Sequence, residues 1–466
     1  MSGFFLVDDR EDELKIIHDC FVRAGIPCLP INYINDDPDN ITGIDHIDTS
    51  KLSPRVIVTD LNLSEGSLEP INLAGPIAEL LGNLINSGPY ILYFWSKNIS
   101  KVEEVVKILE SRFSDKIQLP IHWGTLDKIE FMTGKADLND KVHTLLQECP
   151  IFNAIFDWEN RVAYAAQQTT NSLFHITTPK SSVDKEYNHI QSLSDTLAVI
   201  GNEALGNKNA KDNPSIAIDM GLAPVLNDRL SLMESDPSFW KDAIPDIGKY
   251  KPLSEEAICN LNSFYHVERV AENYPKNCKG VFVELSRDVL GNAEQKLKFE
   301  SKLGRDLDTI FVDEFISTRK QEDKSRAESR AFRNDAKENI TLGFIELSAD
   351  CDQAQRKTKL NKYVFAALVP IKFSELTIFE SDGVTRERAH DGIYRCPSFE
   401  LNGEYYILLI TYRYQIGTIP TSTIGGANYV NKWFGAPLFR LKEQIMGDIS
   451  FRCAQHATRP GIVAFH

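Results

Sequence analysis

The sequence predicts a multidomain protein with an N-terminal doubly wound α/β domain, a helical middle domain and a small, barrel-like α+β domain at its end. Residues 1–147 alternate apolar strands with amphipathic helices, which is the pattern of a sheet covered on both faces. Residues 151–270 repeat apolar positions at helical spacing. Residues 271–340 are mostly charged and are expected to form a connector with one short strand and helices. In residues 341–466, β patterns dominate until one terminal helix.

The bulk composition is that of a soluble globular protein long enough for several domains. The chain has 466 residues, of which 42% are hydrophobic and 25% charged. No apolar run reaches the roughly 18 to 20 residues of a membrane helix, and the N-terminus lacks the features of a secretory signal. Eight cysteines without a C-x-x-C pair indicate reduced thiols. We therefore expect a cytoplasmic protein without a membrane partner.

The acidity of the chain is concentrated near its N-terminus. The net charge is −15, and residues 1–150 carry 13 basic against 24 acidic side chains, a balance of −11. The remaining 316 residues carry 38 against 42, a balance of −4. This charge disfavours nucleic acid as a partner of the whole molecule, although a local basic groove in the C-terminal part stays open.

The first domain is expected to contain strands and helices in regular alternation. Strands are predicted at residues 4–7, 55–59, 90–95 and 117–123, with helices at residues 10–24, 99–113 and 135–148. The first helix is expected to end at Gly25, because glycine readily adopts the left-handed conformation of a helix C-terminus. A long polar loop is expected at residues 32–53.

Three acidic residues follow two of these strands. Asp8 and Asp9 come directly after the first strand, and Asp60 follows the strand at residues 55–59. Parallel strands place their carboxyl ends at one edge of a sheet, where ligands bind in α/β folds. Carboxylates that meet there repel one another unless a hard cation such as Mg²⁺ lies among them. With the cation bound, one carboxylate can act as a nucleophile toward phosphorus.

This arrangement resembles the receiver domain of bacterial two-component signalling. The resemblance implies that Asp8 and Asp9 hold Mg²⁺ and that Asp60 accepts a phosphoryl group from a kinase partner. It also assigns Ser96, at the end of the fourth strand, to sensing the phosphoryl oxygens. The family carries a Lys-Pro pair after strand five, whereas here Lys128 is the nearest downstream lysine and no proline follows it. Receivers also pair with one another, so a homodimer is expected by analogy.

The middle of the chain is predicted to be mainly helical. Helices are expected at residues 151–176, 181–206, 215–234 and 252–266, with a polar loop at residues 206–214. The helix at residues 151–176 is either a signalling helix that transmits the state of the first domain or an ordinary core helix. In the charged connector, residues 319–326 fit a solvated helix better than a nucleic-acid-binding stripe, because their charges alternate in sign.

The last part of the chain is expected to contain strands at residues 280–284, 343–348, 363–371 and 404–412. Asn402 and Gly403 form a hairpin turn signal before the last of these strands. A terminal helix is predicted at residues 441–456.

A second set of candidate residues lies in this C-terminal part. Asp350, Cys351 and Asp352 follow a strand, and the two acids with His390 or His456 have the chemistry of a metal site. The alternative is that Cys351 is a core residue and one aspartate caps a turn.

The terminal helix carries a basic pair. Arg452 and His456 are four residues apart and therefore share one face of that helix. They either bind phosphate or an acidic partner, or complement the helix C-terminus.

The segment 348–352 has the form S-x-x-C-D and, with the basic terminal residues 452–461, resembles uncharacterised bacterial proteins with an N-terminal receiver. That resemblance implies a role in conflict systems such as anti-phage defence. Three functions are then open. The first is a regulatory protein in which the receiver controls a C-terminal output, and it is the one we expect. The second is a metal-dependent hydrolase or nuclease in the C-terminal domain, and the third is a non-catalytic module of a defence complex.

Overall fold

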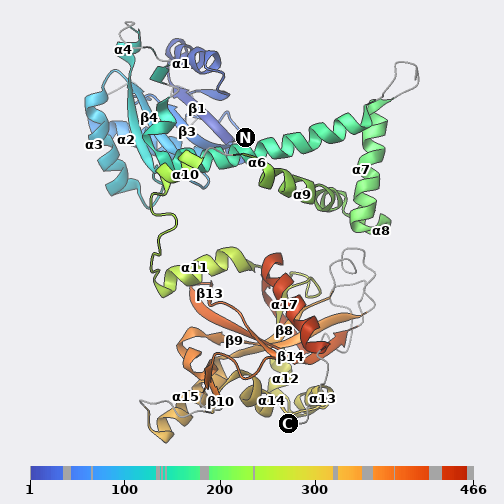
Figure 1. The fold of residues 1–466 in the computed structure, drawn as a ribbon. Helices are drawn as coiled ribbons and strands as arrows, with labels where there is room; N and C mark the ends of the chain where they lie inside the picture. The colour runs from blue at the N-terminus through green and yellow to red at the C-terminus, as the bar shows by residue number, and fades with distance from the viewer. Residues whose placement is uncertain are drawn as a thin grey trace. The chain divides into compact units, whose positions relative to one another are not determined.

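The computed structural model describes residues 2–34, 43–64, 67–132, 137, 140–141, 144–178, 188–234, 237–318, 324–348, 360–381, 384–418 and 433–458. It contains two compact units (Figure 1). The first comprises residues 1–175 and 225–249, and the second comprises residues 176–224 and 250–466. No helix in the described part of the chain is both long and apolar enough to cross a membrane.

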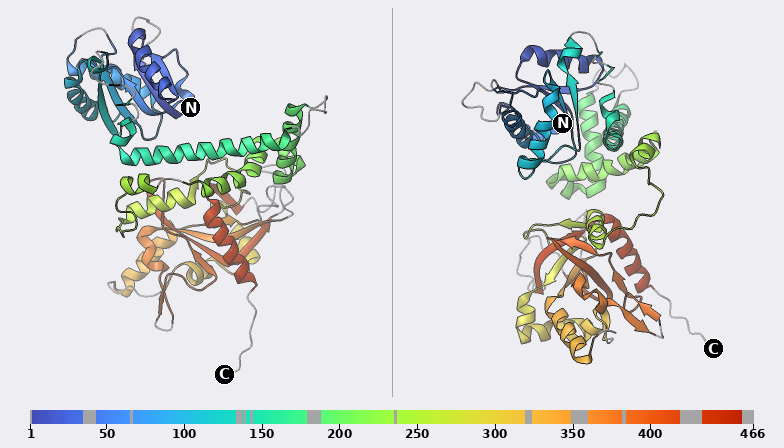
Figure 2. Two further views of the ribbon diagram at one scale, coloured as in Figure 1. Left: turned by 45° about the horizontal axis from the view of Figure 1, so that its top comes forward. Right: turned by 90° about the vertical axis from the view of Figure 1, so that its left-hand side faces the viewer.

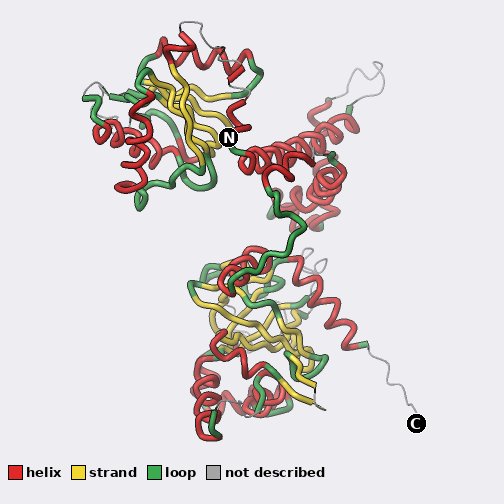
Figure 3. The backbone as a smooth tube through the Cα atoms, turned by 60° about the vertical axis from the view of Figure 1, so that its left-hand side comes forward, coloured by secondary structure: helices red, strands yellow, loops and turns green. Residues whose placement is uncertain are grey.

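A five-stranded parallel sheet organises the first unit. Its strand order is β2-β1-β3-β4-β5, and all neighbouring pairs are parallel. The strands are β1 (Ser2–Asp8), β2 (Cys28–Asn32), β3 (Ser53–Thr59), β4 (Ile91–Ser96) and β5 (His122–Asp127). Helices cover both faces of this sheet (Figure 3). The predicted doubly wound α/β architecture of this part is confirmed at this level.

Alternate residues of each strand build two separate cores, as the period of two in a strand requires. Phe5, Val7 and Ile57 pack with the helices α2 (Pro70–Leu84) and α3 (Val102–Ile108) on one face. On the other face, Phe4 and Leu6 pack with α1 (Glu11–Arg23) and the start of α6 (Pro150–Thr177). The predicted end of the first helix is confirmed, since Gly25 has a φ of 72°.

Short helical segments complete the first unit. They are η1 (Thr49–Lys51), η2 (Ile99–Lys101), the π-helical turn η3 (Leu109–Phe113), α4 (Lys128–Met132), η4 (Leu145–Glu148) and α10 (Pro237–Ala243). Part of the predicted closing helix at residues 135–148 lies outside the described residues, and η4 occupies its end.

The prediction for strand five was wrong by several residues. The strand spans His122–Asp127, not residues 117–123. Ile117 instead packs into the core with α2 and α3. The Ile121 amide donates to the Tyr90 carbonyl at 3.0 Å before the strand begins. Because β5 is an edge strand, most of its residues are only half-buried, and the apolar pattern that marks an inner strand is weak there.

The helical middle is described as α6, α7 (His189–Leu205), α8 (Asn207–Asp212) and α9 (Pro214–Leu232). The helices predicted at residues 151–176 and 215–234 are confirmed, as is the described part of 181–206. The polar loop predicted at residues 206–214 was wrong, because α8 occupies most of it. Gly206, with a φ of 78°, turns the chain into α8, and Ala210 is buried with Leu205 and Ala217.

An eight-stranded sheet organises the second unit. Its order is β12-β14-β9-β8-β7-β15-β6, with β13 also paired to β14, and its ladders are antiparallel. The strands are β6 (Val267–Arg269), β7 (Val281–Leu285), β8 (Thr341–Glu346), β9 (Asn361–Pro370), β12 (Ile393–Arg395), β13 (Phe399–Leu401), β14 (Glu404–Thr418) and β15 (Phe434–Leu441). A separate hairpin joins β10 (Phe379–Ser381) to β11 (Val384–Arg386).

The predicted Asn402-Gly403 hairpin turn joins β13 to β14, and both residues have a positive φ, 55° and 84°. In the described strands, β6 lies at one end of the sheet, and β12 and β13, which both pair with β14, lie at the other. Side chains link these ends, because Arg269 of β6 pairs with Glu400 of β13 at 2.9 Å. Ser263 of α11 (Glu255–His266) also donates to the Glu400 carbonyl.

Helices cover both faces of this second sheet as well (Figures 1 and 2). One face packs on α12 (Arg287–Gly291), α13 (Ala293–Leu303), α14 (Leu307–Ile310), the π-helical turn η5 (Phe311–Phe315), α15 (Arg326–Asn339) and η6 (Ile371–Thr377). The other packs on α17 (Glu443–Ala457). The segment 271–340, expected as a connector, thus supplies β7 and much of one core. The centre of its charged run, residues 319–323, lies outside the described residues.

Candidate functional site

Three carboxylates meet at the carboxyl edge of the parallel sheet. Asp8 ends β1, Asp9 follows it, and Asp60 follows β3, the neighbour of β1. The backbone amide of Asp60 donates to the Val7 carbonyl at 2.9 Å, which ties the end of β3 to β1. One carboxylate oxygen from each aspartate lies within 4.8 Å of the others. The structure therefore brings together the acids that the sequence predicts to converge.

Lys128 lies among these acids. It is the first residue of α4 and directly follows β5. Its Nζ lies 2.8 Å from Asp8 Oδ2, 2.7 Å from Glu13 Oε2 and 2.9 Å from Asp60 Oδ2, and its side chain is 1% exposed. The corrected position of strand five explains this contact, because the predicted strand left Lys128 several residues along a loop.

Glu13 is a member of the site that the sequence analysis did not identify. It is almost fully buried in α1, and its Oε1 accepts from Lys97 Nζ at 2.7 Å. A signal was present in the sequence, because Glu13 precedes Ile17 by four residues and Phe21 by eight. That spacing places Glu13 on the buried face of the helix.

The pKa values show how charge is balanced in the pocket. Burial raises the pKa of Asp8 to about 7, the Lys128 ammonium opposes this rise, and the Asp60 charge adds to it. Burial and the Asp60 charge also raise the pKa of Asp9. Burial alone would raise the pKa of Glu13, but bonds from Lys128 and Lys97 outweigh it and lower that pKa to about 2. Negative charge at Asp8 and Asp9 is thus only partly neutralised.

This donor set fits a magnesium ion. Carboxylate oxygens are the ligands that a hard divalent cation prefers, and the three aspartates form the one group of potential ligands found in the described residues. The raised pKa values of Asp8 and Asp9 indicate that a further positive charge would be favourable there. Asp8, Asp9 and Asp60 are therefore the residues that would hold the ion.

Two residues of β4 border the pocket. Ser96 ends the strand and is buried, and its Oγ accepts from the Asn98 amide at 3.2 Å. Trp95, the preceding residue, lies beside Lys128, with the Nζ 5.9 Å from the ring centroid. The ring of Phe131 of α4 stacks on the Trp95 ring, with 5.8 Å between the two centroids. Ser96 thus lies at the edge that the sequence predicts, and Trp95 helps to position α4.

The C-terminal candidates do not assemble into a metal site in the described residues. Asp350, Cys351 and Asp352 lie outside the described residues, so their arrangement stays a prediction. Both ring nitrogens of His390 are engaged, with Nε2 2.7 Å from Glu314 Oε2 and Nδ1 accepting from the Gly392 amide at 2.9 Å. His390 therefore holds the loop before β12 against η5.

Arg452 and His456 lie on α17, as the sequence predicts. Arg452 Nε donates to Asp448 Oδ1 at 3.0 Å. His456 and His390 both approach Gly392, where a Cβ atom would come within 2.8 Å and 2.9 Å of their rings. A side chain at position 392 would therefore collide with both histidines.

The chain was compared with protein-family models, with curated proteins and with solved structures, and none of the three comparisons found a match.

Proposed function

We propose that the first unit is a receiver-like phospho-acceptor module that controls the rest of the chain. The observation that carries this proposal is the contact of the buried Lys128 ammonium with Asp8 and Asp60, at 2.8 Å and 2.9 Å. The strand order 2-1-3-4-5 is that of flavodoxin-like folds, in which the ligand site lies at the β1/β3 switch point. The acidic cluster lies at that point.

In this proposal Asp60 is the nucleophile. One Asp60 carboxylate oxygen attacks the phosphorus of a phosphorylated donor, a new O–P bond forms, and the bond from phosphorus to the donor atom breaks with its electron pair leaving on the donor. A bound Mg²⁺ would supply charge neutralisation for the phosphoryl oxygens. Lys128 Nζ lies 2.9 Å from Asp60 Oδ2 and can donate a charge-assisted hydrogen bond to a phosphoryl oxygen. Ser96 lies at this edge and offers a hydroxyl.

The helix α6 is the element that we propose to carry the state of this module onward. Its first turns pack on the sheet, where Phe156 meets Phe4 of β1 edge-on at 6.1 Å. Phe156 also stacks on Phe152 of the same helix at 5.9 Å. Arg55 of β3 makes a two-pronged contact with Glu159, at 2.9 Å and 2.8 Å. The strand that ends next to Asp60 is therefore bonded to the helix that leaves the module.

The test is binding of beryllofluoride, which mimics an acyl phosphate, measured by isothermal titration calorimetry on the full chain. We expect saturable binding that requires Mg²⁺ and is lost in Asp60→Asn. Asp12→Asn is the matched control, because Asp12 is an exposed acid of the same helix turn as Glu13 and pairs only with Arg10 in the contacts described for it. It is expected to leave the affinity unchanged.

Two results would reject the proposal. Wild-type protein that binds Mg²⁺ but no beryllofluoride would have a metal site without an acceptor function. Equal loss of binding in Asp60→Asn and Asp12→Asn would show that general acidity, and not the Asp60 carboxylate, attracts the probe.

A further inference from the structure

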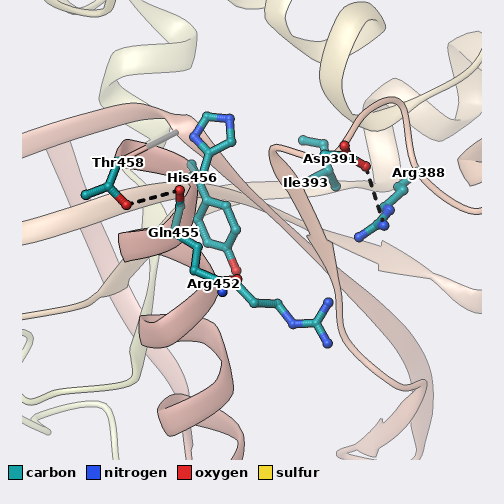
Figure 4. Close-up of a pocket in the computed structure, with 8 residues that line it drawn as sticks. Arg388, Asp391, Ile393, Arg452, Gln455, His456 and Thr458 are labelled. Atoms are coloured by element: carbon teal, nitrogen blue, oxygen red, sulfur yellow. Dashed lines mark hydrogen bonds and ion pairs between the residues drawn. The ribbon is translucent and has the colours of Figure 1, made fainter. Parts of the chain in front are cut away.

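A cleft in the second unit lies between α17 and the loop that leads into β12. Two adjoining cavities of about 490 Å³ and about 700 Å³ form it, and Arg388, Asp391 and Arg452 line both. Figure 4 shows Arg452 and His456 on the helix, across from Arg388 and Asp391 on the loop. Cavities of this size are typical of sites for small organic ligands.

Positive charge is concentrated in this cleft although the chain has a net charge of −15. Four arginines line the two cavities against two acids, namely Arg386, Arg388, Arg395 and Arg452 against Glu387 and Asp391. The nearest acids hold two of them loosely, since Arg388 is 3.6 Å from Asp391 and Arg395 is 4.0 Å from Glu387. These distances exceed a hydrogen bond, so the guanidinium groups retain donors for another acceptor.

Buried donors without partners add a second, independent observation. The Tyr412 hydroxyl and Arg395 Nε are buried and have no hydrogen-bond partner in the described structure. Tyr412 is 4% exposed and lines the smaller cavity. Buried donors are ordinarily satisfied, and one that faces a cavity indicates a missing acceptor.

One further arginine, Arg452, is already held in position. Arg452 is fixed by Asp448 and lies over the Tyr394 ring, 5.5 Å from its centroid. The ring of Tyr412 lies 6.0 Å from that of His456. The cleft thus combines one fixed guanidinium group and two loosely held ones with aromatic walls.

We propose that this cleft binds a small phosphate-bearing ligand of nucleotide size. Phosphate oxygens accept several charge-assisted hydrogen bonds at once and match the planar fork of arginine. The Tyr412 hydroxyl in one cavity and Arg395 Nε in the other add donors without partners in the described structure. A nucleic-acid strand fits less well, because the negative charge of the whole chain opposes a long polyanion.

The test is isothermal titration calorimetry of the full chain with ATP, pyrophosphate and inorganic phosphate. The buffer contains EDTA and no Mg²⁺ or fluoride, so the acidic pocket of the first unit is not probed and failure of one proposal does not imply failure of the other. We expect one saturable site, and Arg388→Glu is expected to weaken it at least about tenfold by replacing a donor with a repelling charge. Arg330→Glu is the matched control, because Arg330 is an exposed residue of α15 in the same unit.

A second variant separates a binding role from a structural one. Tyr412→Phe removes a hydroxyl that has no partner in the described structure. The unliganded protein is therefore expected to keep or raise its melting temperature, whereas its affinity for ATP is expected to fall about fivefold. A melting temperature that falls while the affinity stays unchanged would contradict the binding role of this hydroxyl.

The probes also distinguish the sources of phosphate. Inorganic phosphate binding as tightly as ATP would support the proposal and assign the site to the phosphate group alone. Absence of saturable binding by all three probes would overturn the proposal, as would equal losses in Arg388→Glu and Arg330→Glu. Tighter binding of a single-stranded oligonucleotide than of ATP would overturn the assignment to a small ligand.

Discussion

At the residue scale, Lys128 decides the charge balance of the acidic pocket. Its ammonium group contacts Asp8, Glu13 and Asp60, and all four side chains are buried or nearly so. Burial alone would lower the pKa of Lys128, but the charges of Asp60 and Asp8 outweigh that effect and raise it. The lysine is therefore held in its charged form, and the carboxylates depend on it while no other cation is bound.

We expect Lys128→Met to destabilise the first unit by about 3 to 5 kcal/mol in metal-free buffer, because breaking a buried ion pair leaves uncompensated charge. Added Mg²⁺ is expected to restore part of this loss, since the ion would neutralise Asp8 and Asp60. Urea unfolding with and without Mg²⁺ measures both effects.

Lys97→Met is the control for this variant. Lys97 also contacts Glu13, but its side chain is 43% exposed, so its loss should cost less than about 1 kcal/mol. Similar destabilisation by both variants would show that Glu13, and not the aspartate cluster, dominates the charge balance.

In the second unit, Glu314 introduces a pH dependence. It is fully buried and contacts His390 at 2.7 Å, Thr411 at 2.8 Å and Arg413 at 3.4 Å. Burial would raise its pKa, but the bonds from His390 and Thr411 outweigh burial and lower it. An acid with a lowered folded-state pKa stabilises the fold fully above its ordinary pKa of 4.5, and this contribution is lost as the pH falls through the folded-state pKa.

Glu314→Gln is therefore expected to be about 1 to 3 kcal/mol less stable than wild type at neutral pH. The difference should shrink as the pH is lowered through the acid range, because only the wild type loses the contribution of the carboxylate. Urea unfolding at a series of pH values compares the two slopes. A difference that stays constant down to about pH 3 would exclude Glu314 as the titrating group.

At the element scale, the inner strands of the parallel sheet could be predicted from the sequence, whereas the position of the edge strand β5 could not. The strands that lead to Asp8 and Asp60 are buried over most of their length, so their continuous apolar runs identify them. The edge strand β5 has a weak apolar pattern, and its misplacement also misplaced Lys128. The three aspartates could thus be predicted, whereas Glu13 was missed and Lys128 could be named only as the nearest downstream lysine.

The arginine-lined cleft could be predicted only in part, for a different physical reason. Arg452 and His456 share a helix face and could be paired from their spacing. Arg388, Tyr412 and Arg395 come from a loop and two strands that only the antiparallel sheet brings together. No local pattern in a single sequence encodes such long-range pairings.

Besides its apolar packing, α6 is attached to the sheet by a polar contact that can be altered without removing charge. Arg55 is 14% and Glu159 is 26% exposed, and the guanidinium bonds both carboxylate oxygens. Arg55→Lys keeps the charge but cannot form two parallel bonds. We expect a loss of about 1 kcal/mol and faster amide exchange in the first turns of α6, measured by hydrogen–deuterium exchange with mass spectrometry.

Arg161→Lys provides the matched comparison. Arg161 pairs with Asp157 one turn away in the same helix, so this contact does not join α6 to the sheet. Its replacement should leave exchange in the first turns of α6 nearly unchanged. If both variants accelerate exchange equally, the Arg55 contact is not what anchors the helix.

At the scale of the whole molecule, a regulatory function requires that binding in one unit changes binding in the other. The division between the units falls within α6 and α9, after residues 175 and 224. Two helices are thus continuous in sequence from one unit into the other. In the proposed function, these two helices are the covalently continuous elements through which the state of the acidic pocket would reach the second unit.

If both proposals hold, Mg²⁺ with beryllofluoride should change the affinity of the arginine-lined cleft for ATP by about fivefold or more, the range of typical allosteric coupling. Calorimetric titration of ATP with and without beryllofluoride, at constant Mg²⁺, measures this change. Thermodynamic linkage requires ATP to change the beryllofluoride affinity by the same factor, so the reverse titration is an internal check. Asp60→Asn should remove the coupling and leave the basal ATP affinity unchanged. Equal ATP affinities in the two states would mean that both sites bind their ligands independently, and the output of the acidic pocket would then have to lie elsewhere in the chain.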